Sequence, residues 1–210
     1  MKHVSSKEPK ISVLLHYAPS AINSEYLELA AKCYKQNTTN PYELLIIDEA
    51  GDQYELLNQH IDLCQSNLIV LSGVEYIPCK GWDIPYINNY DDGTILTQFL
   101  IEPGAPSAAP ENHQKIFGWC PRCFRRDEFE AYAAKITHRY KNWKADGGCL
   151  VPSCIPKGIF KYGKFEHPQI MMPTELQFIN KMKKEGIRVK RCESVWYHFQ
   201  KAKCKCWPQT

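Results

Sequence analysis

The stretch ISVLLHYAPSAINSEYLELAAKCYKQN (residues 11–37) joins a short apolar run to an amphipathic segment. Residues 11–17 are rich in strand formers, whereas Tyr26, Ala30 and Cys33 recur at the spacing that places side chains on one face of a helix. We therefore predict a strand that leads directly into a helix.

The same alternation continues along the first half of the chain. Residues 42–48 (YELLIID) and 67–72 (NLIVLS) are further apolar runs of strand length, residues 52–64 between them have a helical pattern, and residues 93–104 offer a fourth strand. Strands that alternate with helices in this way are typical of the α/β class. We expect a doubly wound, mostly parallel sheet flanked by helices.

The whole chain, residues 1–210, is expected to form one domain with two halves. The first half would cover residues 1–104, the second half residues 105–199, and a C-terminal tail residues 200–210. Residues 105–114 (APSAAPENHQ) are rich in Pro, Ala and Ser, which indicates a mobile loop or the joint between the halves.

Two helices are predicted in the second half. Residues 126–143 have an apolar face. Further along, Thr174 followed by Gln177 fits the capping-box pattern for a helix start, and Gly186 stands where that helix should end. A strand closing at His198 is expected to follow.

Composition limits the classes of partner. The formal net charge is +3 and the basic residues are spread among 23 acids, which does not favour a nucleic-acid partner. No apolar run approaches the roughly 18 residues that cross a bilayer, so we expect no transmembrane segment and a cytoplasmic protein. The ten cysteines are then expected to be reduced thiols, with metal binding as the lesser option.

In a doubly wound sheet, ligands bind outside the carboxyl ends of the strands. The loops that follow the first three strands are therefore the candidate site: His16 to Pro19, Asp48 to Asp52, and Ser72 to Glu75. Asp48 can accept hydrogen bonds from a sugar hydroxyl or a base edge. The alternative is that Asp48 only starts the turn around Gly51.

Glu175 is a second candidate. It shares a helix face with Phe178, Ile179 and Met182, so its carboxylate should lie partly inside, near the positive end of the helix. The alternative is that Glu175 simply complements the helix dipole.

The order of features from residue 149 to 199 resembles the C-terminal half of the family 2 glycosyltransferases, which have the GT-A fold. In that family a strand leads through a glycine-rich turn to an acidic pair that opens a helix, a glycine ends the helix, and the next strand closes with histidine. Here YGKF (162–165) stands for the turn and Thr174-Glu175 for the acidic pair, and Gly186 and His198 keep the spacing.

Residues 11–102 resemble the nucleotide-binding half of the same family. The resemblance thus implies a Rossmann-like, nucleotide-sugar-binding half at residues 1–104 and an acceptor and catalytic half at residues 105–199. The resemblance implies that His16, Tyr17 and Ala18 contact the donor nucleotide, together with Asp48 and Ser72. It also implies that Glu175, in the place of the second acid, is the catalytic base.

The family's metal-binding acid pair should follow the third strand, where this sequence has only Glu75. The resemblance implies a divalent cation, Mn²⁺ or Mg²⁺, held by Glu75 and His198. Asp83 and the pair Asp91-Asp92 are other acids nearby, and the pair is more simply a turn.

The implied function is transfer of a sugar from a nucleoside diphosphate sugar to a hydroxyl of a glycan, lipid or protein acceptor, with inversion. Two alternatives stay open. One is a catalytically inactive GT-A-like protein that binds a nucleotide sugar or glycan. The other is a binding module stabilised by structural zinc at Cys120 and Cys123, with Cys149/Cys154 or Cys204/Cys206 completing four thiolates.

Overall fold

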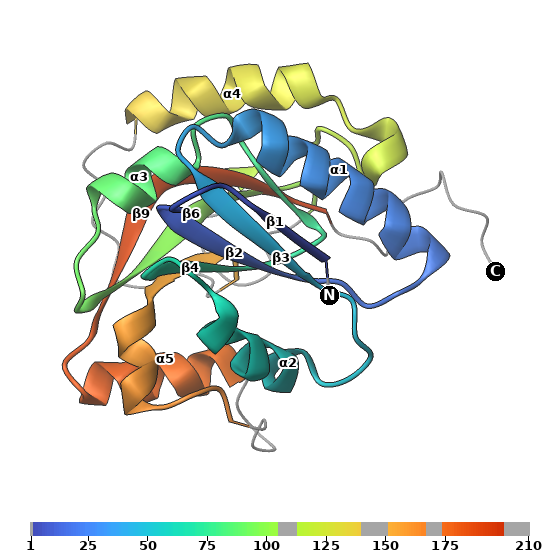
Figure 1. Cartoon of the computed structure of the whole chain (residues 1–210). Helices are drawn as coiled ribbons and strands as arrows, with labels where there is room; N and C mark the ends of the chain where they lie inside the picture. The colour runs from blue at the N-terminus through green and yellow to red at the C-terminus, as the bar shows by residue number, and fades with distance from the viewer. Residues whose placement is uncertain (1, 105–112, 140–150, 167–173, 200–210) are drawn as a thin grey trace.

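The computed structural model describes residues 2–104, 113–139, 151–166 and 174–199, and these form one mixed sheet with helices on both faces (Figure 1). The strands are β1 (Lys2–Ser5), β2 (Ile11–His16), β3 (Tyr42–Ile47), β4 (Leu68–Gly73), β5 (Tyr76–Pro78), β6 (Thr94–Glu102), β7 (His113–Gln114), β8 (Ser153–Pro156) and β9 (Arg188–His198). The helices are α1 (Ala21–Asn37), α2 (Gln53–His60), α3 (Asp83–Asn88), α4 (Arg126–Arg139) and α5 (Thr174–Lys184). Short 3₁₀ turns are η1 (Ile61–Leu63), η2 (Pro121–Cys123) and η3 (Lys157–Tyr162).

The strand order is β1-β3-β2-β4-β8-β6-β9-β5, with β7 paired to β6. The α/β class is therefore confirmed, but the sheet is mixed rather than mostly parallel. The pairs β2/β3, β2/β4, β6/β9 and β6/β7 are parallel, whereas β1/β3, β4/β8, β6/β8 and β5/β9 are antiparallel. Because β8 runs against both β4 and β6, the five longest strands still share one direction, and their carboxyl ends lie at one edge.

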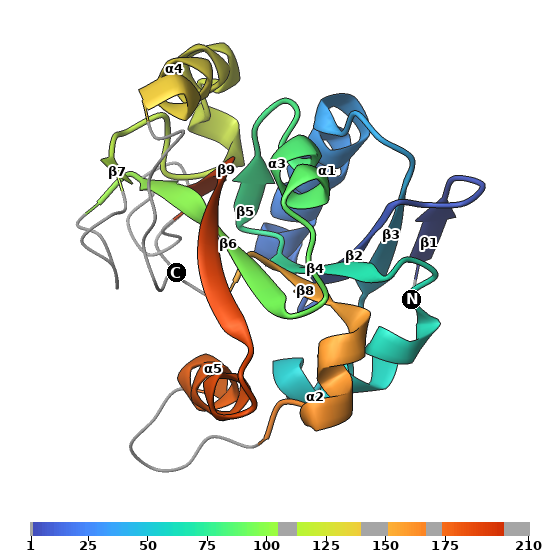
Figure 2. The same cartoon turned by 90° about the vertical axis from the view of Figure 1, so that its left-hand side faces the viewer.

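The helices form two layers, which Figure 2 shows on opposite sides of the sheet: α1, α3 and α4 on one face, and α2 and α5 on the other. The first layer closes over a core that includes Trp82, Phe129 and Trp196. The second layer closes over a smaller core that includes Leu14 and Met182. Both faces of the central strands are thus buried, which explains why their sequences are almost continuously apolar.

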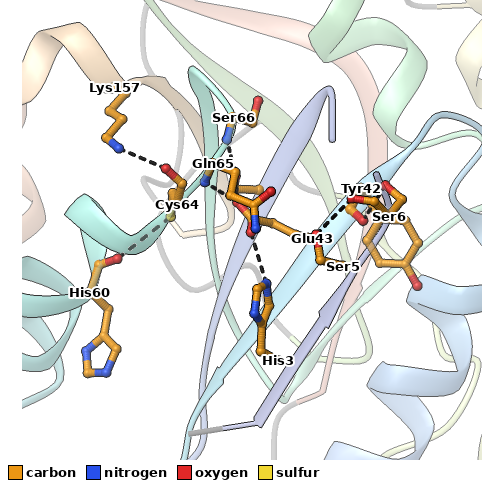
Figure 3. A network of polar contacts seen from close by, with 11 residues as sticks. His3, Ser5, Ser6, Tyr42, Glu43, His60, Cys64, Gln65, Ser66 and Lys157 are labelled. Atoms are coloured by element: carbon orange, nitrogen blue, oxygen red, sulfur yellow. Dashed lines mark hydrogen bonds and ion pairs between the residues drawn. The ribbon is translucent and has the colours of Figure 1, made fainter. Parts of the chain in front are cut away.

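The edge strand β1 was not predicted. It pairs antiparallel with β3, and the buried Glu43 on β3 fastens it there. Glu43 accepts hydrogen bonds from the hydroxyl of Ser12 and from the backbone N–H of Gln65 at 2.5 Å, and it pairs with Nε2 of His3 at 3.1 Å (Figure 3). This polar network lies where β2 and β3 begin, at the amino edge of the sheet. We therefore assign it to stability.

Most predicted elements are present with small changes at their ends. The helix predicted over 52–64 is α2, which ends at His60 and continues as η1. Gly186 has φ 79°, a left-handed conformation that suits glycine, just beyond the end of α5. The last residues of the helix predicted over 126–143, most of the joint at 105–114 and the tail lie outside the described residues.

No helix within the described ranges is long and apolar enough to cross a membrane.

Candidate functional site

The carboxyl end of β2 is the point where the order of the strands reverses. From β2 the chain passes through α1 on one face of the sheet to β3, and from β3 it passes through α2 on the other face to β4, on the far side of β2. Loops that leave adjacent strand ends toward opposite faces leave a crevice between them. That crevice is where open α/β sheets bind their ligands.

The structure brings the first two predicted loops together at this point. His16 is in register with Ile47 on β3 and with Gly73 on β4, and the backbone N–H of Tyr17 donates to the Ile47 carbonyl at 2.9 Å. Asp48 follows Ile47 directly and is half-buried. The structure therefore places the backbones of His16, Tyr17 and Asp48 side by side at this edge, and their contact with a nucleotide stays a prediction.

The loop after β2 is fastened to the first turn of α1. The Tyr17 hydroxyl lies 3.0 Å from the Ser24 hydroxyl, and the Ala18 carbonyl accepts a hydrogen bond of 2.6 Å from the Asn23 amide. The Ser20 hydroxyl caps the helix by accepting the Asn23 backbone N–H at 3.0 Å. The backbone around the exposed Ala18 is thus held in place at the carboxyl end of β2.

Asp52, four residues beyond Asp48, caps the helix that follows β3. One Asp52 carboxylate oxygen accepts the backbone N–H groups of Tyr54 at 3.0 Å and Glu55 at 2.9 Å. The start of α2 therefore has its capping group at Asp52, and the turn does not require Asp48 for that purpose.

Ser72 is placed less favourably for a ligand. Its side chain is buried with 1% exposure, and its hydroxyl donates to the Gly73 carbonyl at 3.2 Å. The hydroxyl thus lies beneath the surface of the carboxyl edge. The neighbouring Gly73 is the residue of β4 that faces His16.

The backbone segments that carry Glu75 and His198 pair with each other although they are far apart in sequence. The backbone N–H of Phe199 donates to the Glu75 carbonyl at 3.0 Å, and the next residue, Tyr76, pairs with His198 across β5 and β9. The Tyr76 and His198 rings stack with their centroids 4.4 Å apart. The Glu75 carboxylate folds back over Gly73, and a Cβ atom at that position would approach it to 2.8 Å, so a side chain there would displace the carboxylate.

Glu102 is a site residue that the sequence analysis missed. It is the last residue of β6 and fully buried, and its carboxylate lies 2.6 Å from Nδ1 of His198. A carboxylate on Nδ1 fixes the orientation of the imidazole and directs Nε2 away from the pair. The signal in the sequence that could have identified Glu102 is its position as an acid at the end of an apolar strand.

The donor set for a metal is small. Within the parts of the chain that the structure describes, no group of three or more His, Cys, Asp or Glu side chains is placed to hold a metal ion. A carboxylate oxygen at Glu75 suits Mn²⁺ or Mg²⁺, and His198 adds one nitrogen. A cation there would take its remaining ligands from water or from the phosphates of a bound nucleotide.

The other acids near the third strand have structural roles. Asp83 is fully buried, and its carboxylate accepts the backbone N–H groups of Thr39 at 3.0 Å and Asn40 at 2.8 Å. Asp91 accepts the Gly93 N–H at 2.8 Å and forms an ion pair with Arg188, as expected of a turn residue. The hydrogen bond from Gly93 and the Arg188 guanidinium lower the pKa of Asp91.

Glu175 lies in the first turn of α5 and is half-buried, while Phe178, Ile179 and Met182 are buried as the helical spacing predicts. The Phe178 ring packs on Phe165 with centroids 4.4 Å apart. Among the described residues, no hydrogen bond or ion pair joins Glu175 to His16, Asp48, Glu75 or His198. The structure thus shows the burial of the helix face, and the catalytic role stays a prediction.

The turn that precedes α5 carries the predicted glycine. Gly163 has φ 151°, and a Cβ atom there would lie 2.5 Å from Nζ of Lys181. A side chain at this position would push Lys181 away from Glu166, its ion-pair partner at 2.5 Å. Glycine in YGKF is therefore explained first by its positive φ, which other residues rarely adopt, and the Lys181 side chain adds a contact that could move aside.

The two cysteines of WCPRC lie together beside β9. Their sulfur atoms are 3.5 Å apart; Cys120 is buried and Cys123 half-buried. Cys154 is buried within β8. The cysteines 149, 204 and 206, proposed as further zinc ligands, lie outside the described residues.

No family model matches the chain, and no curated protein matches it.

Proposed function

We propose that this chain is a nucleotide-sugar-dependent glycosyltransferase with a GT-A-like architecture. The observation that carries the proposal is the switch point at β2, where His16, Tyr17 and Asp48 line the carboxyl edge that Glu75 and His198 also reach. A reversal of strand order with an acid at the same carboxyl edge suits the ribose and base of a nucleotide.

The second half of the chain supports the proposal through its order of elements. Strand β8 leads through the turn at Gly163 to α5, whose first turn carries Glu175, and Gly186 then directs the chain into β9 and His198. This order is the one by which the sequence resembles the family 2 glycosyltransferases.

The proposed reaction breaks the bond between the anomeric carbon of the donor sugar and its diphosphate. An acceptor hydroxyl attacks the anomeric carbon from the opposite side, which inverts its configuration. The Glu175 carboxylate takes the hydroxyl proton, a general-base role that typically contributes 10²–10⁴-fold in rate. Asp48 and the 16–18 loop hold the nucleotide during this step.

Glu75 and His198 would hold a divalent cation if one is used. Such an ion would neutralise charge on the departing diphosphate. The pairing of His198 with Glu102 fixes the orientation of the imidazole and leaves Nε2 free of that contact.

The test is transfer and donor hydrolysis across a panel of nucleotide sugars, with and without manganese. We expect Glu175→Gln to abolish transfer, by at least about 10²-fold, while nucleotide affinity measured by calorimetry stays nearly unchanged. Glu185→Gln, at the exposed end of the same segment, is the matched control and should keep full turnover. Unchanged turnover in Glu175→Gln would show that Glu175 is not the general base.

A second candidate is a GT-A-like protein that binds a nucleotide sugar or glycan without turning it over. Two observations favour it: Thr174 stands where the family has its first acid, and Glu175 has no described contact to the carboxyl edge. Saturable donor binding without hydrolysis or transfer in the same panel would select this candidate.

A further inference from the structure

The segment Trp119–Phe124 holds two thiols in contact. The backbone N–H of Cys123 donates to the Cys120 carbonyl at 3.2 Å, which closes one 3₁₀ turn at Pro121–Cys123. In such a turn residues i and i+3 lie over one another, about 6 Å apart along the axis. That spacing falls within the range of Cα separations that a disulfide bond accepts. The sulfur atoms, already 3.5 Å apart, need only a small side-chain movement to bond.

The backbone around the thiols is tied to the sheet. The Tyr197 hydroxyl on β9 donates to the Gly118 carbonyl at 2.5 Å and accepts the Phe117 N–H at 3.1 Å. The Arg125 N–H then donates to the Phe117 carbonyl at 2.6 Å, which closes the loop. A Cβ atom at Gly118, where φ is 142°, would lie 2.5 Å from the Cys123 carbonyl oxygen, so the loop depends on glycine there. The proximity of the thiols is therefore built into the fold.

The two thiols differ in their surroundings. Cys120 is fully buried, whereas Cys123 is half-buried and its sulfur accepts the backbone N–H of Trp119 at 3.2 Å. The Cys123 thiol also donates to the Cys120 carbonyl at 3.5 Å. Because Cys123 is the more exposed of the two, its sulfur is the one that a small disulfide in solution reaches first. Cys79 shows the opposite case, since burial raises the pKa of its thiol to about 12.

We propose that Cys120 and Cys123 form a redox-active dithiol that is oxidised to an intramolecular disulfide by exchange with small disulfides. The Cys123 thiolate attacks one sulfur of the small disulfide and forms a mixed disulfide, and one small thiolate leaves. Cys120 then loses its proton and attacks the Cys123 sulfur, and the second small thiolate leaves. The protein loses two protons and two electrons, and the small disulfide is reduced to two thiols. This inference does not depend on the proposed transferase activity.

The test uses the full chain, reduced with dithiothreitol, freed of reductant and incubated with oxidised glutathione. We expect the intact mass to fall by two hydrogen atoms and peptide mapping to link residues 120 and 123. Cys120→Ser should accumulate a glutathione adduct on Cys123, because the second attack is lost. Cys123→Ser should form no adduct at residue 120, and the buried-thiol control Cys79→Ser should still form the disulfide.

Alkylation of the reduced wild-type protein gives a readout that needs no variant. Brief exposure to iodoacetamide should label Cys123 well before Cys120 and Cys79. The proposal is overturned if oxidised glutathione produces no link between residues 120 and 123, or if Cys79 is labelled first. Stoichiometric zinc in the purified protein that both Cys120→Ser and Cys123→Ser remove would also overturn it, in favour of a metal site.

Discussion

Glu102 shows how a single buried carboxylate can fix the orientation of a neighbouring imidazole, that of His198. Its partner His198 is 96 residues away in sequence, and the two meet because β6 and β9 run in parallel and end together. No short-range sequence pattern predicts a contact between two residues so far apart in the chain. The half-buried imidazole was visible in the sequence as a candidate, but the group that orients it was not.

For the cation site proposed at Glu75 and His198, we predict that Glu102→Gln weakens manganese binding by about 10- to 100-fold, because the neutral amide orients His198 less firmly. Calorimetric titration with Mn²⁺ in the presence of a nucleoside diphosphate measures the effect. Glu185→Gln is again the control and should bind as the wild type does. Equal affinity in Glu102→Gln would remove Glu102 from the site.

Tyr197 couples stability to alkaline pH. Burial raises the pKa of its phenol to about 12, and the backbone bonds to Phe117 and Gly118 only partly oppose this. Since the folded-state pKa lies above the unfolded value of about 10, the contribution of Tyr197 is fully present below pH 10. It is lost as the pH rises through 12.

The matching variant is Tyr197→Phe. At pH 8 it should lower the free energy of unfolding by about 1–3 kcal/mol, because it leaves the Phe117 N–H and the Gly118 carbonyl without the hydroxyl. Between pH 10 and 12 the gap between wild type and variant should narrow by about 2 kcal/mol. Urea unfolding at a series of pH values tests this, and a constant gap would contradict it.

At the scale of elements, the sequence was informative wherever a segment was long enough to show a period. Strands β2, β3, β4 and β6 and helices α1, α2 and α5 were predicted close to their observed bounds. Strands β1, β5, β7 and β8 have two to four residues each, and so short a segment carries almost no alternation. Their partners define them, and those partners lie elsewhere in the chain.

Helix α3 gives another case in which a distant contact, invisible in the local sequence, decides the role of a residue. Its first residue, Asp83, was weighed as an acid near the metal, yet its carboxylate receives the N–H groups of Thr39 and Asn40 in the connection between α1 and β3. The sequence gives the residue type, but the distance between elements decides what the carboxylate can reach.

We predict that Asp83→Ala lowers the free energy of unfolding by about 3 kcal/mol, because two backbone donors and the Asn40 side chain lose their acceptor. Urea denaturation followed by far-UV circular dichroism provides the measurement. Asp127→Asn, an exposed acid in the first turn of α4, should change stability by less than about 0.5 kcal/mol. Similar losses in the two variants would argue against the anchoring role of Asp83.

At the scale of the molecule, the two edges of the sheet carry different groups of polar residues. The amino edge carries the Glu43 network, which holds β1, β2 and β3 together (Figure 3). The carboxyl edge carries His16, Asp48, Glu75 and His198, where the chain reverses its strand order. The sequence indicated this edge, because the ends of the predicted strands could be located in it. The insertion of the antiparallel β8 between β4 and β6 could not be predicted, because the pairing joins segments that are distant in the chain.

This division gives a prediction for ligand binding as a whole. A nucleoside diphosphate that binds with Mn²⁺ at the carboxyl edge should slow amide hydrogen exchange in residues 16–20, 48–52 and 73–76, because bound ligand restrains these loops and opposes their local opening. Residues 64–66, which contact the Glu43 network at the opposite edge, should exchange at an unchanged rate.

Exchange followed by mass spectrometry, with the adenine, guanine, uracil and cytosine nucleotides compared in turn, measures this pattern. Asp48→Asn serves as the matched variant and should reduce the protection in all three loops together, since it weakens binding without altering the capping of α2 by Asp52. Protection confined to residues 64–66, or unaffected by Asp48→Asn, would place the nucleotide elsewhere and would remove the main support for a transferase.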